Sequence, residues 1–284
     1  MDRQPYRSSG RAMSTWAATP LARRARSDRA TFPAASKSAA GLVDRIGTVR
    51  CNVMARIPIF VALILFAVPA VAADRNYSIG SFERIRIEGP YEVKLATGKP
   101  PSGRATGDER ALDTLTLTVE GQTLIVRARP LAVGENPPSP KIPLVVTLST
   151  PVLRSANVNG GGRLAVARMA GQRLDVAVNG AGAITVQGLE GDQLVATVIG
   201  AGTMTLAGRA GRARFQLSGP GTIDASSLVT NDLIARSEGN GELRLNARYT
   251  ADVTSSGLGA IVVVGKPACK VKSAGGGPIS CGSQ

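Results

Sequence analysis

The chain has 284 residues, enough for one large domain or two small ones, and 43% of them are hydrophobic. Only 4% are aromatic and 33 are glycine, a mixture that suits thin, regularly packed β layers better than a bulky globular core. There is no histidine, which removes the commonest general base and metal ligand. Nucleophilic sites built on Ser-His or Cys-His pairs are therefore excluded.

The net charge of +14 is concentrated at the N-terminus. Residues 1–56 contain 11 of the 34 Lys and Arg and 3 of the 20 Asp and Glu, a net of +8, which leaves +6 for the rest. A nucleic-acid-binding domain instead concentrates its basic residues on the folded surface. This distribution argues against nucleic acid as the partner.

Residues 54–73 have the three parts of a secretory signal peptide: a basic start at Met54-Ala55-Arg56, an apolar run and a small-residue exit near Ala73. The alternative is a membrane anchor. However, the 17 uncharged residues from Ile57 to Ala73 are at the lower limit for spanning a ~30 Å hydrocarbon core, and two are prolines. We predict cleavage near Ala73 or Asp74, no stable membrane span afterwards, and export to the periplasm or cell surface of a Gram-negative bacterium.

Residues 1–53 precede this complete signal and are rich in Arg, Ser and Ala without apolar periodicity. We interpret them as an upstream extension that is not translated, with the natural start at Met54. The alternative is a disordered basic arm that binds nucleic acid.

Residues 74–151 alternate between apolar and polar positions, as strands do, but less regularly than residues 152–284. Examples are Ile85-Arg86-Ile87 and Leu115-Thr116-Leu117, and Gly121-Gln122 has the composition of a turn. We interpret this segment as irregular opening coils of a solenoid, because terminal repeats usually differ from internal ones.

Residues 152–284 repeat with a period of 18 to 20 residues, marked by a Gly-x-Gly. Internal periodicity of this length indicates a solenoid. Apolar residues alternate on both sides of each marker, as in half-buried strands, and glycine tolerates the positive φ of a sharp corner. We therefore predict one all-β domain over residues 74–284, a single-stranded parallel β-helix. Its structural glycines are Gly160, Gly162, Gly180, Gly182, Gly200, Gly202, Gly219, Gly221, Gly239, Gly241, Gly257 and Gly259, followed by Gly275 and Gly277.

The order of these features resembles the head GIN domain family of auto-transporter adhesins. The resemblance rests on the Phe82-Glu83-Arg84-Ile85 opening, Ile87 to Val93, the two strands around Gly121, Leu148 to Leu153, and Val158 to Gly162. It covers roughly residues 81–265 and implies a secreted, right-handed β-helix with an adhesin-like role.

Cys269 and Cys281 are the only cysteines after the predicted signal, and both fall in inward positions of the last coils. In an oxidising compartment we expect a disulfide between them; the alternative is two buried thiols. The absence of a C-x-x-C pair argues against redox catalysis.

Enzymes that act on polysaccharides need clustered carboxylates. The acids of the regular coils fall in different columns of the repeat, and we expect no two of them to meet at one place; they are Asp175, Glu190, Asp192, Asp224, Asp232, Glu238, Glu242 and Asp252. The run from Gly160 to Ala165 matches a dinucleotide fingerprint, but a strand is expected where that motif requires a helix. We expect no cofactor or metal.

The sequence favours a non-enzymatic envelope or secreted protein that binds envelope glycans or surface proteins or has a structural role. The alternative is a polysaccharide lyase or hydrolase with a carboxylate site on the β-helix. An exposed groove lined by two acids and several aromatic residues would favour the enzyme, and a flank of Thr, Ser, Asn and Arg would favour binding.

Overall fold

The computed structural model describes residues 73–130 and 143–283. The predicted extension 1–53 and all of the predicted signal peptide except Ala73 lie outside the described residues.

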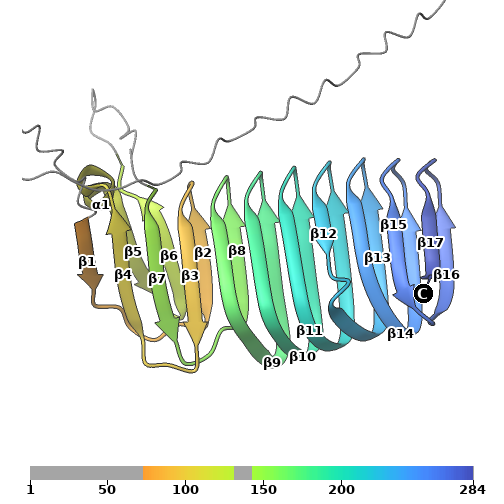
Figure 1. Ribbon diagram of the computed structural model, residues 1–284, viewed down its shortest axis with the longest axis horizontal. Helices are drawn as coiled ribbons and strands as arrows, with labels where there is room; N and C mark the ends of the chain where they lie inside the picture. The colour runs from red at the N-terminus through yellow and green to blue at the C-terminus, as the bar shows by residue number, and fades with distance from the viewer. Residues whose placement is uncertain (1–72, 131–142, 284) are drawn as a thin grey trace, which may run out of the picture. The chain divides into compact units, whose positions relative to one another are not determined.

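Stacked parallel coils form the body of the molecule (Figure 1). Each strand aligns with its equivalent one repeat later: Leu164 pairs with Ile184, and Ile184 with Met204. The predicted all-β solenoid is confirmed. Its regular strands are β8 (Ser155–Asn159), β9 (Arg163–Asn179), β10 (Ala183–Ile199), β11 (Thr203–Ser218), β12 (Thr222–Asp224), β13 (Leu228–Glu238), β14 (Glu242–Ser255), β15 (Ile261–Gly265), β16 (Ala268–Ser273) and β17 (Ile279–Ser283).

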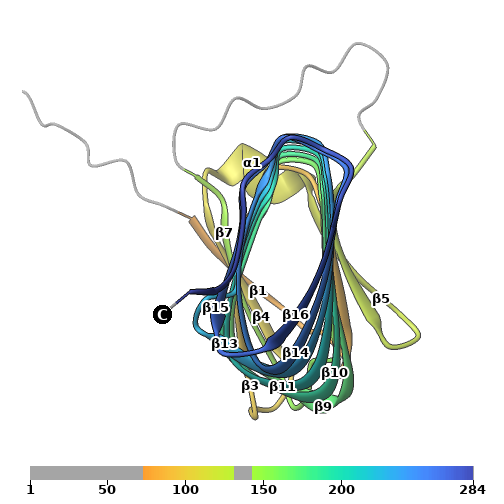
Figure 2. The same cartoon turned by 90° about the vertical axis from the view of Figure 1, so that its right-hand side faces the viewer.

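Each regular coil has two different corners. One is the tight Gly-x-Gly turn, which separates consecutive strands such as β8 and β9. The other corner is wide, and in several coils the backbone stays paired while it bends there, so β9, β10 and β11 run without interruption for 16 or 17 residues. In the coils of β12–β13 and β15–β16 the strand is interrupted at this corner. Figure 2 shows the coils nearly superimposed, with β9, β10, β11 and β14 curving around this end.

The core runs along the inside of the stack, and the residues of each inward column come from successive coils. The alternation predicted around the Gly-x-Gly markers holds: Leu164 and Val166 after the first marker and Leu174 and Val176 before the second are all buried. The neighbouring Ala177 is partly exposed. The apolar positions of the repeat therefore face inward, as period-two strands require.

The tight corner needs glycine for two reasons, seen at Gly180 and Gly182. Gly180 has φ +112°, and a Cβ there would lie 2.9 Å from the Gly160 carbonyl oxygen of the preceding coil. Gly182 has no positive φ, but its Cβ would lie 2.8 Å from the Gly162 oxygen. A side chain at either position would push the stacked backbones apart.

The first strands are not stacked in chain order. They are β1 (Ala73–Tyr77), β2 (Arg84–Glu88), β3 (Glu92–Thr97), β4 (Ser102–Gly107), β5 (Leu115–Glu120), β6 (Thr123–Ala128) and β7 (Val145–Thr150). β2 lies between β6 and β8, and β3 lies between β7 and β9, so the coil β6–β7 is the first parallel coil of the stack although it comes later in the chain. Antiparallel strands continue the sheet beyond this coil: β5 pairs with β6, β4 pairs with β7, and β1 pairs with β4.

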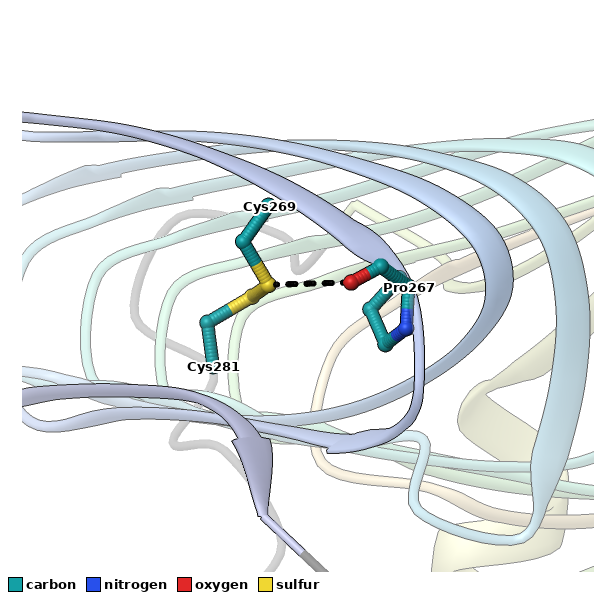
Figure 3. The surroundings of a disulfide bond; sticks show 3 residues. All are labelled: Pro267, Cys269 and Cys281. Atoms are coloured by element: carbon teal, nitrogen blue, oxygen red, sulfur yellow. Dashed lines mark hydrogen bonds between the residues drawn. A yellow bond between two sulfur atoms is a disulfide. The ribbon is translucent and has the colours of Figure 1, made fainter.

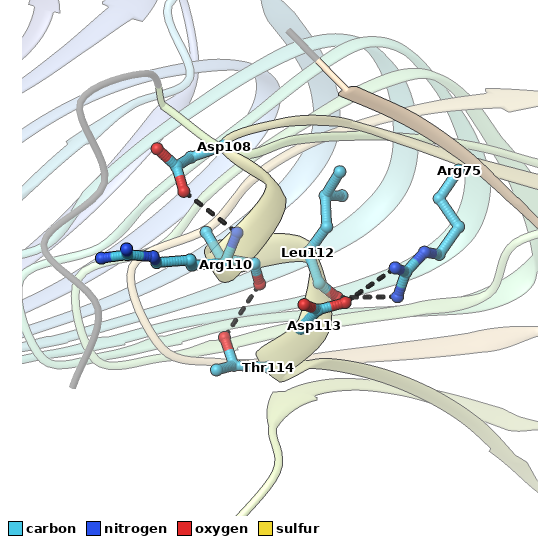
Figure 4. Close-up of polar contacts among 7 residues, drawn as sticks. Arg75, Asp108, Arg110, Leu112, Asp113 and Thr114 are labelled. Carbon is cyan, nitrogen blue, oxygen red and sulfur yellow. Dashed lines mark hydrogen bonds and ion pairs between the residues drawn. The ribbon is translucent and has the colours of Figure 1, made fainter. Parts of the chain in front are cut away.

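A short helix, α1 (Glu109–Thr114), lies among these antiparallel strands and packs against β1 and β4. Asp108 caps it by accepting a hydrogen bond from the Arg110 backbone N–H at 3.1 Å, and the helix buries the side chain of its own Leu112. Arg75 of β1 contacts Asp113 at 2.7 Å (Figure 4). The alternation in this segment did not predict the helix, because a helix of six residues is too short to show a 3.6-residue period.

The C-terminal coil, formed by β16 and β17, contains a disulfide between Cys269 and Cys281, with Cα atoms 6.3 Å apart (Figure 3). Cys269 aligns with the buried Ala251, and Cys281 with the buried Val263, so both occupy inward columns. Cys269 is nevertheless exposed, because no further coil covers this end within the described residues.

Candidate functional site

A groove of about 560 Å³ crosses the wide corner of the regular coils. Its floor is a column of small residues, Gly171, Gly191 and Ala210, which are aligned in register on β9, β10 and β11. Gly211 comes next on β11 and also lines the groove. A Cβ at Gly191 would lie 3.0 Å from the buried Leu174 side chain, and Ala210 is itself buried. Small residues at these inward positions therefore let the backbone bend close to the core, and the backbone forms the floor of the groove.

Polar side chains form the walls of this groove. Glu190 and Asp192 come from β10, Arg209 from β11, Asn231 from β13 and Arg248 from β14. The walls therefore present carboxylate, amide and guanidinium groups together, with both hydrogen-bond donors and acceptors.

Two smaller hollows continue the groove onto the outward face of the strands. The first, about 350 Å³, shares Asp192 and Asn231 with the groove at the corner and adds Arg212 and Asp232. The second, about 330 Å³, shares Arg212 and Asp232 with the first and adds Arg214. We call these three hollows together the corner groove. It spans strands β9 to β14, and rigid, hydrogen-bonded strands hold its residues in place.

Some charges of the corner groove are neutralised within the protein. Glu190 bonds Arg168 at 2.5 Å, and Asp232 accepts a hydrogen bond from the Thr250 hydroxyl at 2.7 Å. The Arg248 guanidinium lies 5.9 Å from the ring centroid of the exposed Tyr249. Within the described residues, the side chain of Asp192 has neither an ion pair nor a hydrogen bond.

The arginines on β11 are likewise without a partner among the described residues. Arg209, Arg212 and Arg214 are exposed and form neither an ion pair nor a side-chain hydrogen bond to any described residue. Arg173, on β9, lies 3.7 Å from Asp175, a distance that gives only a weak, solvent-screened pair. The corner groove thus contains more free positive than free negative charge.

The expectation that no two acids meet at one place needs correction in part: Glu190 and Asp192 line one groove, and Asp192 and Asp232 line the adjoining hollow. Glu190 and Asp192 are both exposed and lie two residues apart on β10, so the alternation of the strand places them on the same face. Asp175 points outward, as expected from its buried neighbours Leu174 and Val176, and its side chain is 47% exposed.

The predicted structural glycines lie at the tight corner, away from the residues that line the corner groove. The floor of the groove was not predicted from the sequence. A signal for it exists, because Gly171, Gly191 and Gly211 recur every 20 residues, like the Gly-x-Gly markers. This weaker repeat was hidden by the stronger one.

The chemistry of the corner groove suits binding more than catalysis. Its three acids, Glu190, Asp192 and Asp232, would fit the enzyme alternative, but no described aromatic residue is among its lining residues. In the part of the chain that the structure describes, no three His, Cys, Asp or Glu side chains come together to hold a metal ion. No described helix is long and apolar enough to span a bilayer.

Comparison with known proteins gives one family match and several similar folds. The model of a family described as "Putative auto-transporter adhesin, head GIN domain" matches residues 81–267. A "putative adhesin" from Bacteroides fragilis has 23% identity and a TM-score of 0.69 over 74% of this chain and 97% of its own. A "putative lipid binding protein" from Parabacteroides distasonis has 21% identity and a TM-score of 0.62, over 76% and 98%. At these identities the likeness establishes the fold alone. No curated protein matches.

Proposed function

Because the chain belongs to the head GIN domain family of auto-transporter adhesins, we propose that it is an exported, non-enzymatic protein that binds glycans of the cell envelope through the corner groove. The observation that carries this proposal is the groove itself. It is an open channel across five coils, with a floor of small residues and walls of Glu, Asp, Asn, Gln and Arg side chains.

Sugars present hydroxyl groups that both donate and accept hydrogen bonds, and such side chains complement them. A channel that runs along the stack suits a linear polymer better than a compact ligand. The parallel coils fix the walls before binding, which lowers the entropic cost of association.

One observation supports the exported state. The Cys269–Cys281 disulfide is typical of a protein that folds in an oxidising compartment. N-terminal sequencing of periplasmic or secreted material should find Ala73 or Asp74 first, and residues from before Met54 would contradict the predicted start site.

A glycan array with the purified protein tests the function. We expect binding to at least one envelope glycan and a loss of that binding in Asp192→Ala, whose side chain has no partner in the described structure to destabilise. Asp252→Ala is the matched control: it is an outward aspartate on β14 that does not line the groove. Equal losses in both variants, or no loss in Asp192→Ala, would remove the groove from the proposal.

The alternative is a polysaccharide-acting enzyme, favoured by the presence of Glu190 and Asp192 in one groove. Against it, the Glu190 carboxylate is bound by Arg168. Release of reducing ends or unsaturated sugars from the bound glycan, abolished by Asp192→Asn, would establish the enzyme and contradict a purely binding role.

A further inference from the structure

The unpaired positive charge of the corner groove favours anionic glycans over neutral ones. We infer that the groove binds an acidic polysaccharide, whose carboxylate or sulfate groups are held by the arginines of β9 and β11. This inference rests on the proposed glycan-binding function and narrows it to one class of ligand.

Positive charge is in excess in the corner groove, which is lined by five arginines and three acids. Arg209, Arg212 and Arg214 lie within six residues of one strand. Glu190 and Asp232 are the register neighbours of Arg209 and Arg212, but none of the three arginines forms an ion pair with a described acid. Like charges held this close repel one another, and an anionic ligand relieves that repulsion. Guanidinium groups also bind carboxylates and sulfates in a planar, two-point geometry.

The arginines are also regularly spaced along the stack. Arg173 and Gln193 are register partners, and Gln193 is in turn the partner of Arg212, so the two arginines stand two coils apart in one column. With coils about 4.8 Å apart, their backbone positions are separated by roughly 10 Å. The separation of the two arginines is close to the length of a disaccharide unit. Gln193 lies between the two arginines and can bond a ring hydroxyl. A polysaccharide with one acidic group per disaccharide would match this column.

Two other polyanions fit the groove less well. Single-stranded nucleic acids bind through aromatic side chains on which the bases stack, and no described aromatic residue lines these hollows. A membrane surface is broad and flat, whereas the arginines lie along hollows. The acidic polysaccharide is therefore the occupant that the geometry favours.

The test measures the affinity of the purified protein for four probes: hyaluronan, neutral dextran, anionic phospholipid vesicles and single-stranded DNA. Hyaluronan should bind at least roughly 10-fold more tightly than dextran, as expected for one or more charge-assisted hydrogen bonds. The affinity should fall as salt rises, because binding releases counterions.

The double variant Arg212→Gln/Arg214→Gln should lose roughly 10-fold or more in affinity for hyaluronan and weaken the salt dependence. Arg163→Gln is the matched control: it is an exposed arginine of β9 that lies outside the corner groove and has no ionic partner among the described residues. Its affinity should not change. Both variants should retain the wild-type melting temperature, because the substituted side chains are exposed.

Equal affinity for hyaluronan and dextran, or no effect of the double variant, would overturn this inference and leave the glycan-binding proposal standing. Tighter binding of vesicles or DNA than of hyaluronan would overturn the choice of a polysaccharide. If the array and both polysaccharides show no binding, the proposed function fails, and the inference fails with it.

Discussion

Val176 and Ala177 are adjacent residues of β9 that face opposite sides of the solenoid wall, so the same substitution should have very different effects at each. Val176 is 1% exposed and lies in an inward column between Ala156 and Ala196. Replacing it with aspartate removes a buried side chain worth about 1.5–3 kcal/mol. It also buries an unpaired carboxylate, at a further cost of several kcal/mol.

Ala177 lies in the neighbouring outward column, beside Asn157 and Thr197. An aspartate there remains in contact with solvent and polar neighbours, so Ala177→Asp should cost about 1 kcal/mol or less, mainly through strand propensity. Domains have only about 5–15 kcal/mol of net stability, so Val176→Asp should unfold at least several coils. A solenoid can lose coils locally, since each contacts mainly its neighbours.

Thermal unfolding followed by circular dichroism, together with amide hydrogen exchange of β8 to β10, measures the difference. For a domain of 150–250 residues, each kcal/mol shifts the melting temperature by about 2–4 °C. Ala177→Asp should therefore shift it by only a few degrees, and Val176→Asp by far more. Similar losses from the two variants, or a larger loss at position 177, would refute the assigned register.

Three further predictions concern the corners and ends of the stack. Gly180→Ala should cost roughly 1–3 kcal/mol because of its φ of +112° and the close Gly160 backbone, whereas Gly161→Ala, with open space around it, should be neutral in the same melts. Ser237→Ala should raise stability by about 1–3 kcal/mol, because the buried hydroxyl has no hydrogen-bond partner in the described structure; a lower melting temperature would contradict this. Replacing Cys269 and Cys281 with serine should lower the free energy of unfolding by roughly 2–3 kcal/mol, since their disulfide closes the last coil. Hydrogen-exchange protection should fall first in β16. Unchanged protection would show that the disulfide stabilises nothing there.

The regular coils could be predicted from sequence because their information is local and repeated. Gly160 and Gly162 recur as Gly180 and Gly182, and the apolar alternation on both sides sets which residues face inward. In a strand the side-chain period is two, so one register satisfies every coil at once. The first coils could not be ordered in this way. The position of β2 between β6 and β8 depends on contacts between residues far apart in the chain, such as Arg84 with Thr123 and Ser155.

The candidate site depended still more on tertiary structure. The acids and arginines of the groove were visible in the sequence, and alternation alone places Glu190 and Asp192 on one face of β10. What the sequence did not show is that Arg209, Asn231 and Arg248 from later coils line the same hollow. The wide corner brings them together, because the chain bends there while β9, β10 and β11 remain paired. The repeat determined the direction and spacing of the strands, but the curvature of the backbone decided which polar side chains share a surface, and curvature depends on packing across the whole stack.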